Sequence, residues 1–354
     1  MNKPGARLAD IAERTGYSKN TVSLALRESP RIPEATRLLI RQAAHELNYL
    51  PNHIAKSLAS RETKTVGLIL ADITNPILTE TSKAIEKALA KLGYGTLFAT
   101  SNNTLREEIA AVEMFRSRQV DGLLVYPARG HRDYRHLIDL RQANFPVVML
   151  IPGEAIGVDM VSVDERLGAY KAVRHLIDLG HRRIGTLDGS NPGGNRQKFD
   201  GYLEALRQAD IPFEPDWQVE PAGFTPAAGY WAMDTLMSTA RPSAVFVAND
   251  YIAVGAVRWC QKRGLRIPED VALIGFDNLE IGEFLGTPLS SVNYETDVLV
   301  RMAIERLLRL IKARGVLPEP RVTLVEPELV IRDSTGHARR VPEAERQAVA
   351  VPGS

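Results

Sequence analysis

Short apolar runs alternate with amphipathic stretches throughout residues 66–334, and this alternation limits the chain to one fold class. The runs predict β-strands at residues 66–71, 95–100, 122–126, 147–151, 183–188, 244–248 and 271–276. Strands that alternate with helices form parallel sheets with right-handed crossovers, covered by helices on both faces. Because the region is longer than one ordinary domain, we expect an α/β fold of two doubly wound parallel-sheet subdomains.

The stretch after Pro76 shows the helical part of this pattern. Its predicted inward face consists of Thr81, Ile85, Ala88, Leu89 and Leu92. Gly93 follows as a stop signal, so we expect this helix to end there.

Polar residues follow the predicted strands. They are Asp72, Asn75, Asp164, Asp188, Asn249, Asp250, Asp277 and Asn278. The carboxyl ends of parallel strands are where such sheets bind ligands, so these side chains are candidate ligand contacts. Each one could instead be a helix N-cap, which is a common use of Asp and Asn after a strand.

Residues 1–61 differ from the rest of the chain in charge. They carry ten basic and five acidic side chains, a net charge of +5, whereas the remainder carries 34 basic and 38 acidic ones, a net charge of −4. A small basic region joined to a larger, mildly acidic one suggests a polyanion-binding module attached to a second function.

Helical spacing predicts three short helices in residues 1–50. Gly16 interrupts the first pattern, Ser18 is placed to cap the second helix, and the third begins near Pro33. Their apolar residues are Leu8, Ile11 and Ala12, then Val22, Ala25 and Leu26, then Leu39, Ile40, Ala43 and Leu47. This layout is that of a helix-turn-helix module, whose second helix enters the major groove of DNA. A three-helix protein-interaction module remains the alternative on spacing alone.

The second predicted helix supplies the candidate DNA contacts. Its outward residues, after the cap Ser18, are Lys19, Asn20, Thr21, Ser23, Leu24 and Arg27. Lys and Asn side chains can hydrogen-bond base edges, while Thr and Ser suit phosphate oxygens.

A short segment, residues 51–63, separates this module from the α/β region. Ile54, Ala55 and Leu58 can share one side of a short helix that Asn52 would cap. A helix of about ten residues is marginal in water because nucleation is costly. The segment is therefore either an ordinary linker or a helix that forms only with a partner.

Several linked motifs in order carry a resemblance to a known family. They are LADIAERTGYSKNTVSLAL (8–26), VDGLLV (120–125), GHRRIG (180–185), AVFVAND (244–250), RIPEDVALIGFDN (266–278) and ELVIRDS (328–334). The chain resembles the LacI/GalR family of transcriptional regulators along residues up to about 333. The resemblance implies a helix-turn-helix domain (1–50), a hinge helix (51–63) and a periplasmic-binding-protein-like effector-binding and dimerisation domain (64–334).

The resemblance also implies individual contacts. In the hinge it points to DNA contacts by Asn52, His53, Ala55 and Leu58, with Leu58 as a wedge in the minor groove. For the effector, the resemblance points to contacts by Ile77, Leu78, Lys198, Phe224, Asn249 and Asp277. The strand-end residue Asp164 is a further candidate effector contact. The sequence departs from the family pattern where Ile77 and Leu78 replace frequent aromatic residues and Lys198 replaces a frequent Arg. In the second predicted helix, which the resemblance makes the DNA recognition helix, Leu24 and Arg27 likewise replace residues that are frequent in the family.

No pattern of an enzyme, metal site or cofactor site stands out. Nucleophile-elbow, phosphate-loop, HExxH and CxxC motifs are absent, so we expect no catalytic residues, no metal and no cofactor. His175 and His181 flank the end of a predicted helix, but no third metal ligand is evident near them. We expect the thiol of Cys260 to lie in the core.

The sequence as a whole predicts a cytoplasmic repressor that acts as a homodimer on a pseudopalindromic operator. Its affinity would respond to a small molecule, most simply a carbohydrate, acting as inducer or corepressor. The first residues contain no apolar signal segment, and no apolar run is long enough to span a membrane. Residues 335–354 lack the apolar heptads of a tetramerising coiled coil, and we expect this tail to be disordered. The alternative is a soluble sugar-binding protein without DNA-dependent regulation.

Overall fold

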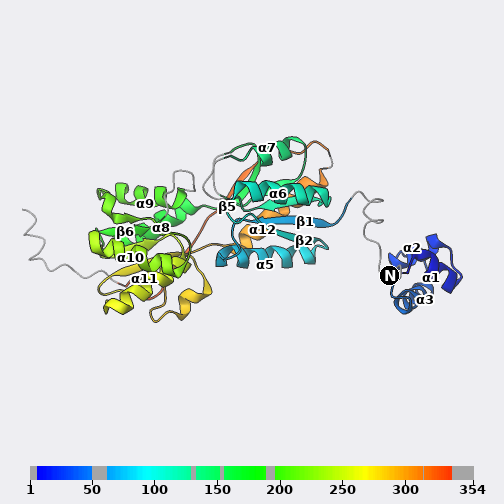
Figure 1. Ribbon diagram of the computed structural model, residues 1–354, viewed down its shortest axis with the longest axis horizontal. Coiled ribbons are helices and arrows are strands. Elements are labelled where there is room, and N and C mark those ends of the chain that lie inside the picture. Colours follow the sequence, from blue (N-terminus) through cyan, green and yellow to red (C-terminus); the bar gives the residue numbers. More distant parts are fainter. Residues whose placement is uncertain are drawn as a thin grey trace, which may run out of the picture. The chain divides into compact units, whose positions relative to one another are not determined.

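The computed structural model describes residues 6–49, 62–128, 133–151, 155–188, 196–313 and 315–336. The chain divides into two compact units, Met1–Thr63 and Lys64–Ser354, which are described separately (Figure 1). Most of the predicted hinge segment and of the predicted tail lies outside the described residues.

The described part of the first unit consists of three helices around a small core. They are α1 (Leu8–Thr15), α2 (Lys19–Leu26) and α3 (Glu34–Glu46). Gly16 ends α1 with a φ of 72°, which an L side chain rarely adopts, and Ser18 caps α2 by accepting the Thr21 N–H at 3.1 Å. The core is formed by Ile11, Val22, Ala25, Ile40, Ala43 and Ala44. The prediction that Leu39 shares this inward face was wrong, because Leu39 is 50% exposed.

The second unit contains two six-stranded sheets. The first has the strand order β11-β5-β4-β3-β1-β2, and the pairs within it are parallel. Its strands are β1 (Thr65–Leu70), β2 (Gly95–Thr100), β3 (Gly122–Val125), β4 (Val147–Met149), β5 (Asp159–Val163) and β11 (Val322–Val325). Helices α5 (Pro76–Lys91) and α12 (Thr296–Lys312) pack on one face, and α6 (Leu105–Ser117) and α7 (Arg135–Gln142) on the other.

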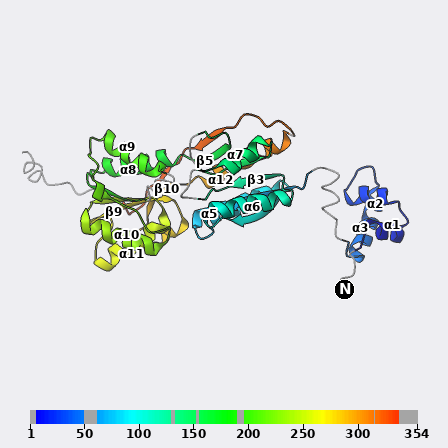
Figure 2. The ribbon, with the colours of Figure 1, turned by 45° about the horizontal axis from the view of Figure 1, so that its top comes forward.

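The second sheet has the order β12-β10-β9-β8-β6-β7. Its strands are β6 (Ile184–Leu187), β7 (Gln218–Val219), β8 (Ala244–Val247), β9 (Ala272–Asp277), β10 (Ser290–Asn293) and β12 (Leu329–Val330). Figure 2 shows α8 (Glu165–Asp178) and α9 (Gln197–Gln208) on one side of it, and α10 (Pro226–Thr239) and α11 (Asp250–Arg263) on the other. Two 3-10 turns, η1 (Pro215–Trp217) and η2 (Glu280–Phe284), complete the described elements.

The chain passes between the two sheets at three places in its described part. It does so after β5, after β10 and after β11, so α12 and β11 return to the first sheet late in the sequence.

Two expectations about this unit need correction. The strands β5, β7, β10, β11 and β12 were not predicted, and β12 pairs antiparallel with β10 in an otherwise parallel sheet. Leu92 was predicted on the inward face of α5, yet it follows the last helical residue and is 54% exposed.

Candidate functional site

Helix α2 presents the residues that were predicted to contact DNA. Val22 and Ala25 are buried in the core and fix the orientation of the helix. On its other sides Ser18, Lys19, Asn20 and Arg27 are exposed, whereas Thr21, Ser23 and Leu24 are half-buried.

The charges of this unit leave part of its basic surface available. Arg14 pairs with Glu46 at 2.8 Å and Arg41 with Glu28 at 3.2 Å. Within residues 6–49, Lys19 and Arg27 form no such ion pair, so their cations can face a polyanion. The hinge predictions Asn52, His53, Ala55 and Leu58 lie outside the described residues.

In the second unit, three of the predicted effector residues meet at the carboxyl edge of the second sheet. Asn249 caps α11, where its Oδ1 accepts the amide hydrogens of Tyr251 and Ile252 at 2.9 and 3.3 Å. Its Nδ2 donates to Oδ2 of Asp277 at the end of β9. Both side chains are buried, with residue exposures of 4%.

Lys198 of α9 joins the same cluster. Its ammonium donates to the carbonyl of Ala248 at 2.8 Å and lies 3.9 Å from Oδ1 of Asp277. It also lies 3.8 Å from the centre of the Phe276 ring. The ammonium group of Lys198 offers a point charge and lacks the bidentate hydrogen-bonding geometry of an arginine guanidinium.

The backbone at Asp277 is strained. Asp277 has a φ of 107° and Asn278 one of 54°, values that favour glycine. A non-glycine residue there costs on the order of 1–3 kcal/mol, and such strain persists where the surroundings hold it. The Asn278 N–H donates to Oγ of Ser291 at 3.1 Å, and Arg332 donates to the Asn278 side-chain oxygen at 2.9 Å.

The remaining predicted effector residues lie on other elements. Asp164 caps α8 by accepting the Leu167 N–H at 2.9 Å, and Phe224 precedes α10 with 36% of its surface exposed. Ile77 and Leu78, in the first turn of α5, are only 5% exposed and belong to the apolar core. The contacts described above connect only Lys198, Asn249 and Asp277.

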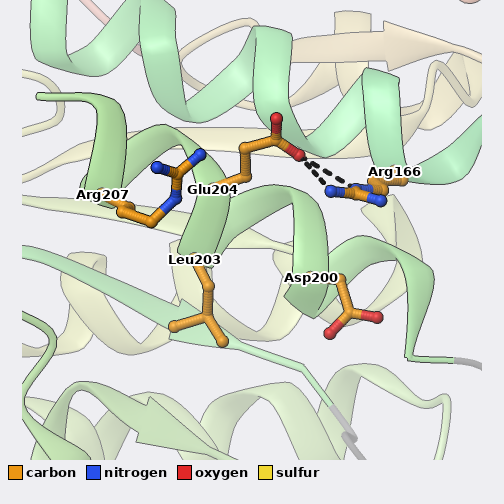
Figure 3. Close-up of a pocket in the computed structure, with 5 residues that line it drawn as sticks. All are labelled: Arg166, Asp200, Leu203, Glu204 and Arg207. Carbon is orange, nitrogen blue, oxygen red and sulfur yellow. Dashed lines mark hydrogen bonds and ion pairs between the residues drawn. The ribbon is translucent and has the colours of Figure 1, made fainter.

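One surface pocket, of about 300 Å³, lies between α8 and α9 (Figure 3). It is lined by Arg166, Asp200, Leu203, Glu204 and Arg207, and Arg166 is paired with Glu204 at 2.5 Å. None of the predicted effector residues lines it.

The described residues contain no cluster of three or more potential metal ligands. His181 bonds Ser243 through Nδ1 at 2.9 Å, and His175 bonds Thr335 at 3.2 Å. Cys260 is fully buried, as predicted, and burial raises the pKa of its thiol to about 12.

Residues of both units match known protein families. Residues 7–52 match the family described as bacterial regulatory proteins, lacI family, and residues 173–335 match the periplasmic binding protein-like domain. The transcriptional repressor PurR of Serratia proteamaculans is 34% identical over 343 residues, which cover 93% of this chain and 96% of that protein. The ribose operon repressor of Haemophilus influenzae is 33% identical over 333 residues, covering 93% and 98%.

The chain is also similar to solved structures of transcriptional regulators. The Lac repressor dimer bound to operator and the anti-inducer ONPF is 25% identical, with a TM-score of 0.82 and coverage of 94% of this chain and 99% of that one. The complex of the transcriptional regulator CelR with cellobiose is 29% identical, with a TM-score of 0.69 and coverage of 93% and 99%.

Proposed function

The chain belongs to the lacI family of bacterial regulatory proteins, and from this premise we propose how its parts serve that function. It is a DNA-binding transcriptional repressor that is controlled by a small-molecule effector and acts as a homodimer on operator DNA, and it is not an enzyme. DNA-dependent regulation is thereby confirmed over the alternative of a simple sugar-binding protein.

For DNA recognition we propose that α2 lies in the major groove. The exposed Lys19 and Asn20 would contact base edges, while Thr21 and Ser23 would contact phosphates, and Leu24 and Arg27 would complete this surface. The burial of Val22 and Ala25 supports this orientation because it turns the opposite side of the helix outward. Asn52, His53, Ala55 and Leu58 remain proposed hinge contacts.

For the effector we propose a sugar bound at the carboxyl edge of the second sheet. The observation that carries this proposal is the contact of Lys198, Asn249 and Asp277 at that edge. Arrays of neutral hydroxyl groups are bound by charge-assisted hydrogen bonds from groups in fixed positions. Asp164, Phe224, Ile77 and Leu78 remain proposed contacts from neighbouring elements.

We further propose that the protein acts in the cytoplasm, where bacterial DNA is accessible to it. Among the described residues, none of the helices combines the length and the apolar character that a membrane span requires. Effector binding would change how the two hinge segments of the dimer pair and fold. The ligand can shift that equilibrium only by its differential affinity, typically about 1–3 kcal/mol of coupling.

A thermal-shift screen of the full-length protein tests the effector class. The panel contains D-ribose, D-glucose, cellobiose and two purine bases. A sugar at about 100 times its Kd should add about 2.7 kcal/mol of stability. A response to the purine bases alone would contradict the sugar proposal, and a failure to select any sequence from random duplexes would contradict the proposed DNA interface.

A further inference from the structure

Asp250 neighbours the proposed effector cluster of Lys198, Asn249 and Asp277. It is the first residue of α11, follows the cap Asn249 in sequence, and is only 1% exposed. Its Oδ2 accepts the Leu279 N–H at 2.8 Å, and its Oδ1 accepts the hydroxyl of Ser291 at 2.8 Å. A buried carboxyl group therefore links α11, the segment after β9 and strand β10.

These hydrogen bonds hold the strained turn that begins at Asp277. Oγ of Ser291, the partner of Asp250, also accepts the N–H of Asn278 at 3.1 Å. Asp250 and Ser291 therefore accept the two consecutive amide hydrogens that follow Asp277. Without these acceptors, the left-handed conformations at 277 and 278 would lose two of the contacts that compensate for their strain.

The sheet leaves space for this carboxyl group at Gly275. A Cβ atom added at Gly275 would lie 1.9 Å from Oδ1 of Asp250. Glycine is therefore required at this position of β9, two residues before Asp277, for the carboxyl group to reach the turn.

We propose that Asp250 is a positioning residue of the effector site, which fixes the turn after β9 and thereby aims the Asp277 carboxylate at the effector. The proposal rests on the proposed function in that Asp277 is taken as an effector contact. Asp250 acts through Asp277 and Asn278 and does not itself touch the ligand.

The protonation state of Asp250 determines which replacement is conservative. Burial and the nearby charge of Asp277 raise the pKa of Asp250 to about 8, so the carboxyl group is largely neutral at pH 7. A neutral acid still accepts the Leu279 N–H and can donate its own O–H to Oγ of Ser291. Asparagine can make the same two contacts, one through its oxygen and one through its NH₂ group.

The test uses four variants of the full-length protein. Asp250→Ala removes both contacts, Asp250→Asn retains them, and Ser291→Ala removes only the hydroxyl. Ser290→Ala is the matched control, because Ser290 is equally buried on β10 but its hydroxyl bonds the main-chain carbonyl and N–H of Arg332 and the hydroxyl of Thr335 instead. Two readouts are taken: amide hydrogen exchange at residues 278 and 279, and calorimetric affinity for whichever of D-ribose, D-glucose and cellobiose stabilises the wild type.

We expect Asp250→Ala and Ser291→Ala to accelerate exchange at the turn and to weaken sugar affinity about tenfold or more, the loss typical of a misplaced buried hydrogen bond. Asp250→Asn and Ser290→Ala should both keep the exchange at residues 278 and 279 and the sugar affinity near wild type. If Asp250→Ala does not fold, Ser291→Ala against Ser290→Ala decides the question.

Unchanged exchange at the turn in Asp250→Ala and Ser291→Ala overturns the proposal, as does faster exchange with unchanged affinity. If no sugar of the panel binds the wild type, the proposed effector class fails by itself. Affinity is then measured with whichever purine base of the panel stabilises the wild type, and an unchanged affinity for it in Asp250→Ala and Ser291→Ala overturns the positioning role.

Discussion

The side-chain amide of Asn249 donates to the carboxylate of Asp277, so the N-cap of α11 is joined to the end of β9. The same Asn249 caps its helix through Oδ1, which leaves only its NH₂ group to orient the carboxylate. One side chain thus connects a structural role in α11 with the proposed contact to the effector.

The Asp277 carboxylate should dominate sugar affinity. Asp277→Asn removes the charged acceptor while keeping the size of the side chain, and we expect affinity to fall about tenfold to a hundredfold. Calorimetry on the full-length protein measures this. Asp270→Asn is the control, because Asp270 pairs with Arg266 four residues earlier in the chain, away from the cluster. Equal affinity of Asp277→Asn and wild type would place the effector site elsewhere.

Replacement of Lys19 should alter DNA recognition differently from replacement of Thr21. Lys19→Ala is expected to relax the preference at particular base pairs, while Thr21→Ala weakens all sequences alike. Log affinity falls with log salt concentration, and each lost phosphate contact should make the slope of this line less steep by about 0.9. Selection from random duplexes and salt titration measure the two effects. A uniform loss of affinity in Lys19→Ala, with its base preferences intact, would reassign Lys19 to the phosphate backbone.

Stability should fall on acidification because of two histidines. Burial lowers the pKa of both His175 and His181 below the usual value of 6.5. Between the lowered and the usual pKa the unfolded chain binds more protons than the folded one, so stability rises with pH there and is lost as pH falls. His181→Asn should flatten the decline in melting temperature between about pH 7 and about pH 5. The exposed His45→Asn is the control, and an equal decline in all three proteins would exclude His181 as a cause.

The close contact of α10 with α11 predicts a sharp effect at one glycine. A Cβ atom at Gly255 would lie 1.8 Å from the carbonyl oxygen of Pro226, so the two helices would have to separate. We expect Gly255→Ala to cost about 1–3 kcal/mol, seen as a lower urea midpoint. Gly286→Ala is the control, because its nearest neighbour atom would be 3.4 Å away. Similar midpoints for Gly255→Ala and wild type would show that the helices can move apart at no cost.

Periodicity predicted some edge strands and some central strands of this fold, such as β2 and β8, and missed others, such as β5 and β12. The strands predicted at 95–100 and 244–248 are observed as β2 (Gly95–Thr100) and β8 (Ala244–Val247), and the Ser18 cap was also predicted, because local sequence determines these features. The two-residue strands β7 and β12 carry no such signal, because only pairing with a neighbour defines them. The exposure of Leu39 likewise depends on how three helices meet rather than on spacing within one.

The sequence predicted which residues form the candidate site, but it did not predict the hydrogen bonds that join them. Asn249 and Asp277 follow strands, so a shared edge could be expected for them. Asp250 was visible in the sequence only as one more strand-end carboxylate. Its role depends on Ser291 and Gly275, which lie 41 and 25 positions away and meet it only in the folded sheet.

The return of α12 and β11 to the first sheet means that neither half of the α/β unit is a continuous piece of the chain. A fragment that stops after β5 lacks the strand β11 and the helix α12, which covers one face of the sheet together with α5. A fragment that starts at α8 carries α12 and β11 without the rest of that sheet. Dissection at the single junction near Asp164 therefore produces two mismatched pieces. A separable half requires a rearranged gene in which the segments encoding residues 64–163 and 296–325 are fused.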